Sequence, residues 1–488
     1  MYLASILISA FLVISLCLGC AAPASKGEQV TRPRGEPTFL VTDLLPQGVA
    51  IGDVSTDRAW LWVRTNGPGV VQIEWAPITA WESVSHAASA VETVARTGQL
   101  SATAETDYTM TIPLDRLRPA TTYRYHVLIG SADSRSEPGA FKLAARGEFT
   151  SLPAPKTSVP VTFAWSGDLG GQGRCRQGAS GYPIFDVIRR QKLEFFLFLG
   201  DTIYADNACP SPPNEPGGNF VANTLETYRA RHLYQRGAEA LRRFLRAVPV
   251  YVVWDDHEVR DNFSGPFDDQ MPAGRQALRE YWPIAVHSDD PHRLYRTVRY
   301  GADLELFILD TRQYRSRNED LDGPRKTMLG STQLQWLLDG LRTSTATWKV
   351  LVTSVPLSVE KGRGGNDGWS GVSDGTGFER ERQVIVETIL HRKIKNVVFL
   401  AGDVHWVQAN AYDPDQDSVV DFHEYMVGPL SARPGRLTAA SEGLHPTRLI
   451  NEAGYQNFGL VRVTKDIFEV TVIDDAGEKR FSHAVQAH

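Results

Sequence analysis

The stretch Phe195-Phe196-Leu197-Phe198-Leu199-Gly200-Asp201-Thr202-Ile203-Tyr204 determines which fold class this chain can adopt. It begins with an unbroken apolar run, which is typical of a strand that is buried on both faces, between two other layers. The run stops abruptly at Gly200-Asp201, so that a carboxylate follows directly after the strand. The stretch therefore predicts a layered α/β domain in which polar side chains gather at the ends of buried strands.

The chain after Pro160 repeats this pattern. The other apolar runs that stop at polar residues are Val161–Trp165, Val248–Trp254, Leu304–Leu309, Val350–Thr353 and Val397–Leu400. The helical patterns between them are Pro183–Arg190, Leu225–Arg246, Arg380–His391 and a segment capped by Ser331, which carries Leu334, Leu337, Leu338 and Leu341 on one face. The strand-like sequence after Val419, which includes Phe468–Ile473, is expected to complete the sheet.

The residues before Pro160 follow a different pattern. Short alternating runs at Ala59–Arg64, Val70–Trp75 and Tyr123–Val127 are separated by Gly, Pro and Asn turns, which predicts antiparallel strands of a β-sandwich. Leu117–Tyr123 resembles the corner of fibronectin type III-like modules, in which a Tyr hydroxyl caps the turn. We therefore expect an all-β sandwich over residues 38–153 and an α/β domain, with layered central sheets flanked by helices, over residues 154–488.

The N-terminus has the character of an export signal. Residues 1–19 carry no charge and are almost wholly apolar, but the run is short for a membrane span. Leu18-Gly19-Cys20 resembles a bacterial lipoprotein cleavage site, with Cys20 as the lipidated residue; an ordinary signal peptide and an uncleaved anchor are the alternatives. We expect a signal over residues 1–20, a polar tether over 21–37, and a protein that works in the periplasm or at the outer surface, with a lipid anchor as its membrane contact.

Composition narrows the classes of partner. The chain has 488 residues with 51 basic and 57 acidic side chains, a formal net charge of −6. It has no Lys/Arg block that would follow a phosphate backbone, so no nucleic-acid-binding surface is expected. Of the 4 cysteines, Cys17 and Cys20 lie in the signal region, and Cys175 and Cys209 are expected to form a disulfide in an exported domain.

The polar residues that follow the apolar runs carry the main functional signal. They form the clusters Ser166-Gly167-Asp168, Gly200–Tyr204, Trp254–Glu258, Asp310-Thr311-Arg312 and Gly402–His405. Any single Asp in this set is explained by a helix cap or a turn. Carboxylates that converge at one edge of a sheet would each cost several kcal/mol if they were buried without a partner. Several strand-end clusters of this kind therefore predict a metal site.

Taken together, these motifs resemble those of the alkaline phosphatase D family of the calcineurin-like metallophosphoesterase superfamily. The resemblance covers both domains, and its motifs are Gly200–Tyr204, Trp254–Glu258, Asp310–Arg315 and Gly402–His405. It implies a binuclear centre in which Asp201 bridges two metals and Tyr204 binds one as a phenolate. The other implied ligands are Asp168, Asp256, Asp403 and His405.

Asp168 stands where relatives usually carry a Cys ligand, and Cys175 is an alternative ligand seven residues away. A phenolate suits Fe³⁺. Four Asp and one tyrosinate carry five negative charges, which a trivalent and a divalent ion balance. The second metal is expected to be Ca²⁺, Mn²⁺ or Zn²⁺, because oxygen ligands favour the first two and His405 keeps Zn²⁺ open.

The resemblance also implies a mechanism. Two metals would lower the pKa of a bridging water, and the hydroxide would attack phosphorus. His257 would protonate the leaving oxygen, with Asp255 or Glu258 orienting its ring; a histidine with a purely structural role is the alternative. Arg312 and Arg315 would bind phosphate oxygens, with surface ion pairs as the alternative.

We therefore expect an exported, monomeric phosphoric ester hydrolase that acts on small phosphomonoesters or phosphodiesters, as an alkaline phosphatase or phosphodiesterase. A phospholipase D-like diesterase that acts on lipid headgroups is the alternative within hydrolases. A cell-surface binding protein that has lost the chemistry is the alternative from another class. The loops Cys209–Asn219 and Gly362–Gly377 are each either a lid or a plain surface excursion.

Overall fold

The structure is a computed structural model that describes residues 39–83, 94–131, 141–361, 366–371, 376–437 and 444–488. The expected signal segment, the tether and the lipidation residue Cys20 lie outside these residues. Within them, no helix combines the length and the apolar character that crossing a membrane requires.

The N-terminal strands form an antiparallel sheet with the order β1-β9-β8-β4-β5, in which β6 also pairs with β4. The bounds are β1 Leu40–Val41, β4 Gly69–Pro77, β5 Ala95–Arg96, β6 Leu100–Ala102, β8 Thr122–Gly130 and β9 Lys142–Thr150, with a short helix α1 at Ile78–Ser83. The expected strands at 59–64, 70–75 and 123–127 are confirmed as parts of β3 (Arg58–Arg64), β4 and β8. At the expected corner, the Tyr123 hydroxyl accepts a hydrogen bond from the backbone N–H of Arg118 at 2.8 Å.

A second, nine-stranded sheet joins the two parts of the chain. Its order is β22-β21-β20-β10-β11-β12-β2-β3-β7, and its first six members come from the α/β domain. Parallel pairing of β12 with β2 places Val250 opposite Gly52, where a Cβ at Gly52 would lie 2.7 Å from the Val250 carbonyl oxygen. The bounds are β2 Val49–Gly52, β3 Arg58–Arg64, β7 Thr109–Asp115, β10 Val161–Ser166, β11 Phe195–Leu199, β12 Val250–Val253, β20 Asn457–Val463, β21 Ile467–Asp474 and β22 Lys479–Gln486.

A seven-stranded sheet forms the other central layer, with the order β13-β14-β15-β16-β18-β17-β19. Its bounds are β13 Arg296–Tyr300, β14 Leu304–Ile308, β15 Trp348–Val352, β16 Val397–Ala401, β17 Val407–Tyr412, β18 Phe422–Met426 and β19 Pro446–Glu452. Two buried tryptophans connect the layers. The indole of Trp165 donates to the Ala401 carbonyl at 3.2 Å, and that of Trp348 donates to the Thr464 carbonyl at 2.9 Å.

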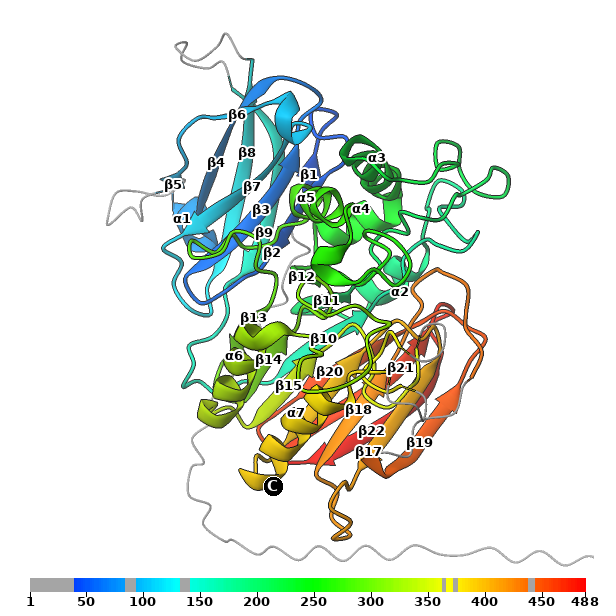
Figure 1. Ribbon diagram of the computed structural model, residues 1–488. Coiled ribbons are helices and arrows are strands. Elements are labelled where there is room, and N and C mark those ends of the chain that lie inside the picture. The colour runs from blue at the N-terminus through cyan, green and yellow to red at the C-terminus, as the bar shows by residue number, and fades with distance from the viewer. Residues whose placement is uncertain (1–38, 84–93, 132–140, 362–365, 372–375, 438–443) are drawn as a thin grey trace, which may run out of the picture. The chain divides into compact units, whose positions relative to one another are not determined.

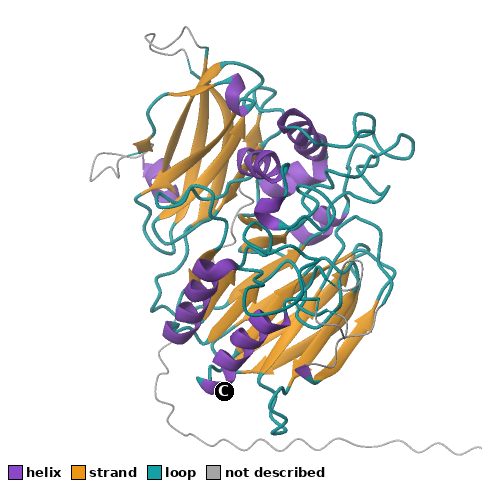
Figure 2. Cartoon of the chain, in the orientation of Figure 1, coloured by secondary structure: helices purple, strands orange, loops and turns teal. Residues whose placement is uncertain are grey.

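Helices cover the outer faces of these sheets (Figures 1 and 2). They are α2 Ile184–Arg189, α3 Leu225–Arg236, α4 Glu239–Leu245, α5 Met271–Tyr281, α6 Gly330–Thr343 and α7 Glu379–His391. Leu337 and Leu341 of α6 share an apolar cluster with Ile385 of α7 and with strand residues of the seven-stranded sheet. The layered arrangement expected from the apolar runs is therefore confirmed, and each of those runs lies within or overlaps a strand.

Two details of the helices differ from the sequence prediction. The segment 225–246 is two helices rather than one, because glycine is a poor helix former and Ala238, after Gly237, is extended with ψ 122°. The helix expected to be capped by Ser331 begins two residues earlier than that cap implies, at Gly330, with Leu329 in the cap position.

Candidate metal centre

The strand ends bring the predicted ligands together. β10, β11 and β12 run parallel in one sheet, and β14, β15 and β16 run parallel in the other. Asp168, Asp201 and Asp403 each lie two residues beyond their strand, with φ of 65°, 50° and 67°, and His405 has φ 60°. This left-handed conformation is unfavourable for non-glycine residues and is concentrated at functional sites.

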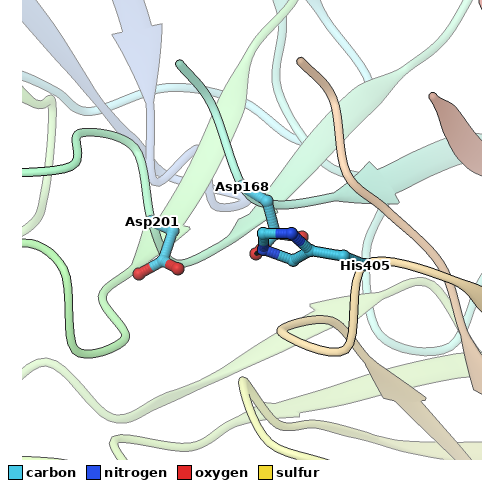
Figure 3. A group of neighbouring side chains, drawn as sticks. All are labelled: Asp168, Asp201 and His405. Carbon is cyan, nitrogen blue, oxygen red and sulfur yellow. Dashed lines mark ion pairs between the residues drawn. The ribbon is translucent and has the colours of Figure 1, made fainter. Parts of the chain in front are cut away.

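The side chains form adjacent groups of donor atoms. Asp168, Asp201 and His405 each offer an atom within 4.8 Å of the others, as Figure 3 illustrates. The same criterion groups Asp201 with Asp256 and His257. It also groups Asp255, Asp256 and Asp403. Because Asp201 and Asp256 are each shared between two groups, the donors form one continuous cluster.

Tyr204 lies next to the first of these groups. It is fully buried, and its hydroxyl lies 2.8 Å from Nε2 of His405, which is itself 3.2 Å from Oδ1 of Asp168. The other ring nitrogen of His405, Nδ1, donates to the Arg433 carbonyl at 2.7 Å. This hydrogen bond fixes the tautomer, so that the lone pair of Nε2 points to Asp168 and Tyr204, as in a metal-binding histidine.

The electrostatics of the cluster fit a cation. Within this cluster, four buried carboxylate oxygens have no hydrogen-bond partner among the described residues: Asp168 Oδ2, Asp255 Oδ2, Asp256 Oδ1 and Asp403 Oδ2. Burial and then the carboxylate of Asp256 raise the pKa of Asp201 well above its usual value. Burial and then Asp201 do the same to the pKa of the Tyr204 hydroxyl. Carboxylates, a phenol and an imidazole with unpaired oxygens are a donor set that bound metal would complete.

His257 belongs to the second donor group, and it lines a cavity into which the cluster opens. Its ring lies 4.2 Å from that of Tyr204, centroid to centroid, and its Nδ1 lies 2.7 Å from Oδ1 of Asp206. The prediction that Asp255 orients this ring is therefore corrected, because Asp206 occupies that position. Burial lowers the pKa of His257, but the carboxylates of Asp256 and Asp206 outweigh it and raise the pKa to about 10.

Asp255 is instead part of a buried charge network. Its Oδ1 accepts from Nε of Arg312 at 2.7 Å, and the terminal nitrogens of Arg312 bind Asp367 at 2.6 and 2.9 Å. Arg315 donates to the same Asp367 at 2.8 Å. Both arginines are fully buried. This corrects the prediction that they bind substrate phosphate, and also its alternative of surface ion pairs, since carboxylates enclose their guanidinium groups.

Glu258 ties the strand ends together. Its carboxylate accepts backbone N–H groups of Asp201 at 3.1 Å, Thr202 at 2.7 Å and Asp255 at 3.0 Å. Burial raises the pKa of Glu258 to about 7, against the effect of these hydrogen bonds. Glu258 therefore positions the ends of β11 and β12 relative to each other and makes no contact with the His257 ring.

The cluster opens into a cavity of about 550 Å³. Asp201, Asp256, Asp403 and His405 line it, and so do three cations that the sequence reasoning missed: Lys361, Arg433 and Arg436. Lys361 Nζ lies 3.1 Å from Oδ1 of Asp403. Asp206 was also missed, although its position two residues after Tyr204 was a signal. No local sequence pattern marks these three cations as residues of the site.

The two flanking loops are held by other contacts. Cys175 and Cys209 form the expected disulfide, with Cα atoms 5.9 Å apart, so the sulfur of Cys175 is not available as the alternative ligand. In the Gly362–Gly377 loop, Asp367 and Trp369 are buried, so its described residues 366–371 are packed into the domain rather than forming a plain surface excursion.

Comparison with known proteins agrees with this site. Residues 163–471 match the PhoD-like phosphatase family and residues 35–145 match the N-terminal domain of PhoD-like phosphatases. Alkaline phosphatase D of Bacillus subtilis (strain 168) is 29% identical over 423 residues, which cover 78% of this chain and 68% of the relative.

Solved structures show the same fold. A PhoD structure has a TM-score of 0.69 at 24% identity, and the match covers 91% of this chain and 89% of that one. The purple acid phosphatase PPD1 from yellow lupin (Lupinus luteus) seeds has a TM-score of 0.63 at 13% identity, covering 91% of this chain and 75% of that one. Because the family match over residues 163–471 spans more than half of the chain, the protein belongs to the PhoD-like phosphatases and is a phosphoesterase that uses a metal cofactor.

Proposed function

We propose that this phosphoesterase hydrolyses small phosphomonoesters or phosphodiesters at a binuclear metal centre. The observation that carries the proposal is the position of Asp201, which belongs to two neighbouring donor groups at once. Asp168, Asp201, Tyr204 and His405 would hold one ion, and Asp201, Asp256 and Asp403 would hold the other. Two donor groups that share a carboxylate would hold two ions as close neighbours, and two-metal phosphoester hydrolysis uses such a pair.

The donor set favours Fe³⁺ at the first position, because Tyr204 would provide a phenolate and Asp168 a carboxylate. Ca²⁺, Mn²⁺ or Zn²⁺ would occupy the second position. When bound, the two ions would supply Lewis acidity, which lowers the pKa of an attacking water and offsets charge on the phosphate oxygens.

The residues of the chain would move the proton to the leaving group. Asp206 holds the Nδ1–H of His257, which leaves Nε2 free to donate its proton to the departing oxygen. Lys361, beside Asp403 in the cavity wall, would offset charge on a phosphate oxygen. The buried network of Asp255, Arg312 and Asp367 would keep the loop after β12, and with it Asp256, in place.

The proposal extends to the setting of the enzyme. A disulfide between Cys175 and Cys209 supports export to an oxidising compartment, the periplasm or the outer surface, with Cys20 as the lipid-anchored residue. The Tyr123 corner supports a fibronectin type III-like N-terminal sandwich. The protein would act as a monomer on small esters and without a nucleic-acid partner.

The test combines metal analysis with turnover. Protein purified aerobically with iron and calcium should contain about two metal ions per chain and should hydrolyse 4-nitrophenyl phosphate or bis(4-nitrophenyl) phosphate. Asp201→Asn should lose metal and activity together. The matched control is Asp413→Asn, because Asp413 lies in a separate acidic group with Asp415 and Asp421. One bound ion in an active wild type, or an active and metal-loaded Asp201→Asn, would contradict the binuclear proposal.

The cavity gives no support to the phospholipase D-like alternative. Its nonpolar lining among the described residues is limited to Val404, Pro434 and Gly435, which offers no groove for acyl chains. The alternative of a binding protein without chemistry is not supported, because the chain belongs to a family of phosphatases.

A further inference from the structure

The charged side chains of the cavity wall differ in sign. Asp261 lines the cavity next to His257, with its carboxylate 4.0 Å from Nε2 of His257. Arg433 and Arg436 line the cavity on the segment that contacts His405. The guanidinium groups of Arg433 and Arg436 attract an anionic substrate group that extends beyond the metal cluster, whereas the carboxylate of Asp261 repels it.

Arg433 and Arg436 are exposed, and neither is paired with a carboxylate among the residues that the structure describes. Arg433 donates a 3.4 Å hydrogen bond to the carbonyl of Gln172, another residue that lines the cavity. The buried Arg312 and Arg315, by contrast, have carboxylate partners. Among the described residues, no carboxylate competes with an anion in the cavity for either exposed guanidinium group.

Backbone contacts fix this segment relative to the metal ligands. The backbone N–H groups of Ser431 and Ala432 donate to the Asp168 carbonyl at 3.2 and 3.1 Å, and that of Gly435 donates to the His405 carbonyl at 2.7 Å. A Cβ at Gly435 would lie 2.7 Å from the Val404 carbonyl oxygen, so only glycine allows this close approach. These contacts hold the backbone of Arg433 and Arg436 next to the metal cluster.

The cavity is larger than a single phosphate group needs. Its volume of about 550 Å³ lies within the range of sites that enclose whole small-molecule ligands. With the hydrolysed phosphate over the metal cluster, the remainder of the ester extends into the part of the cavity that Arg433 and Arg436 line. A guanidinium fork matches the geometry of phosphate oxygens.

We propose that Arg433 and Arg436 form a second anion-binding subsite, which holds a phosphate group of the substrate other than the one that is hydrolysed. The inference rests on the proposed function for the position of the reacting phosphate. It narrows the substrate class from any small ester to esters that carry a further phosphate within reach of the metal centre.

The first test measures binding without turnover. Titration calorimetry on the metal-loaded enzyme compares propane-1,3-bisphosphonate with propylphosphonate, which lacks the second anionic group. The wild type should bind the bisphosphonate roughly tenfold more tightly, since two charge-assisted contacts are added. The double variant Arg433→Gln/Arg436→Gln should bind both with nearly equal affinity. The matched control, Arg462→Gln on the exposed surface of β20, should keep the wild-type ratio.

Equal affinities in the wild type overturn the subsite. A preference that the double variant retains also overturns it, because the second phosphonate would then contact the metals rather than the arginines.

A turnover experiment separates this result from the proposed function. It compares thymidine 5′-(4-nitrophenyl phosphate) with and without a 3′-phosphate, reading only the release of 4-nitrophenol. A wild-type preference for the 3′-phosphorylated ester that the double variant loses supports the subsite. Hydrolysis of both esters without preference, together with equal phosphonate affinities, leaves the phosphoesterase proposal standing and removes the subsite. A phosphonate preference without any ester hydrolysis would support the subsite and contradict the proposed function.

Discussion

Oδ1 of Asp206 lies 2.7 Å from Nδ1 of His257, and this contact determines which ring nitrogen faces the cavity. A carboxylate accepts, so Nδ1 carries the hydrogen and Nε2 is directed to the substrate. Burial raises the pKa of Asp206, but the hydrogen bond and the charge of His257, together with the backbone N–H of Asp261, outweigh burial and lower the pKa, so the carboxylate remains charged. The ring is therefore held in an orientation suited to protonating a leaving oxygen.

Asp206→Asn should lower kcat by about 10- to 100-fold with little change in KM, because it removes the orientation of the acid and no substrate contact. The loss should be large for an alkyl phosphate ester and small for a 4-nitrophenyl ester, whose leaving group needs no proton. The measurement is steady-state kinetics on both esters.

Asp261→Asn is the matched control, since Asp261 is also near His257 but its side chain is 72% exposed. It should retain the wild-type leaving-group dependence. An equal loss on both esters in Asp206→Asn would point to structural damage instead.

Tyr204 should give the enzyme a visible colour if it binds Fe³⁺. The hydroxyl is buried and 2.8 Å from Nε2 of His405, so a phenolate and an imidazole would share the same ion. Aerobically purified protein should show a broad charge-transfer band in the visible spectrum, and Tyr204→Phe should lack it. A colourless wild type with full activity would rule out the iron–tyrosinate assignment and leave hydrolysis intact.

The buried network predicts a stability effect rather than a substrate effect for Arg312. Arg312→Met would remove the ion-pair partner of the buried Asp255 and one of the two arginines that bind the buried Asp367, which costs about 3–5 kcal/mol of unfolding free energy. Urea unfolding followed by tryptophan fluorescence measures the change. Arg433→Met, at an exposed position without a carboxylate partner among the described residues, should cost less than about 0.5 kcal/mol. Similar stabilities for the two variants would disprove the structural role of Arg312.

The strands, and the carboxylates that gather at their ends, could be predicted from the sequence because both depend on local pattern. A strand formed by an apolar run such as Phe195–Leu199 is buried on both faces, and the Asp that follows the run lies at the C-terminal end of that strand. The ends of parallel strands then bring Asp168, Asp201 and Asp403 together without any knowledge of the loops.

The partners of these residues could not be predicted in this way, because they come from distant parts of the chain. Arg312 and Asp255 are 57 positions apart, and Asp367 lies on a Gly-rich loop whose pattern resembles a surface excursion. Whether an Arg after a strand reaches substrate or a buried carboxylate depends on how deeply the layers enclose it. The pairing of β12 with β2 likewise joins two segments whose sequence patterns differ.

The disulfide should contribute to stability as a link between two loops beside the site. Cys175 and Cys209 are separated by 34 residues, and closing a loop of that length in the unfolded chain is worth about 2–4 kcal/mol. Cys175→Ala/Cys209→Ala should lower the unfolding free energy by this amount in urea denaturation. Unchanged stability in the double variant would mean that the unfolded chain is not constrained by this link.

His232 should make the folded protein less stable as the pH falls. Its ring is buried against Tyr281, with centroids 5.1 Å apart, and burial followed by the charge of Arg236 lowers its pKa from 6.5 to about 3. The unfolded chain therefore binds a proton below pH 6.5 that the folded chain does not accept until about pH 3. Stability is lost across this interval, by about 2 kcal/mol between pH 7 and pH 5. His232→Asn removes the titrating group. The unfolding free energies of wild type and variant are measured in urea at pH 7 and at pH 5. The wild type should lose about 2 kcal/mol relative to the variant when the pH falls from 7 to 5. Parallel pH profiles for the two proteins would show that this histidine accepts a proton in the folded state as readily as in the unfolded one.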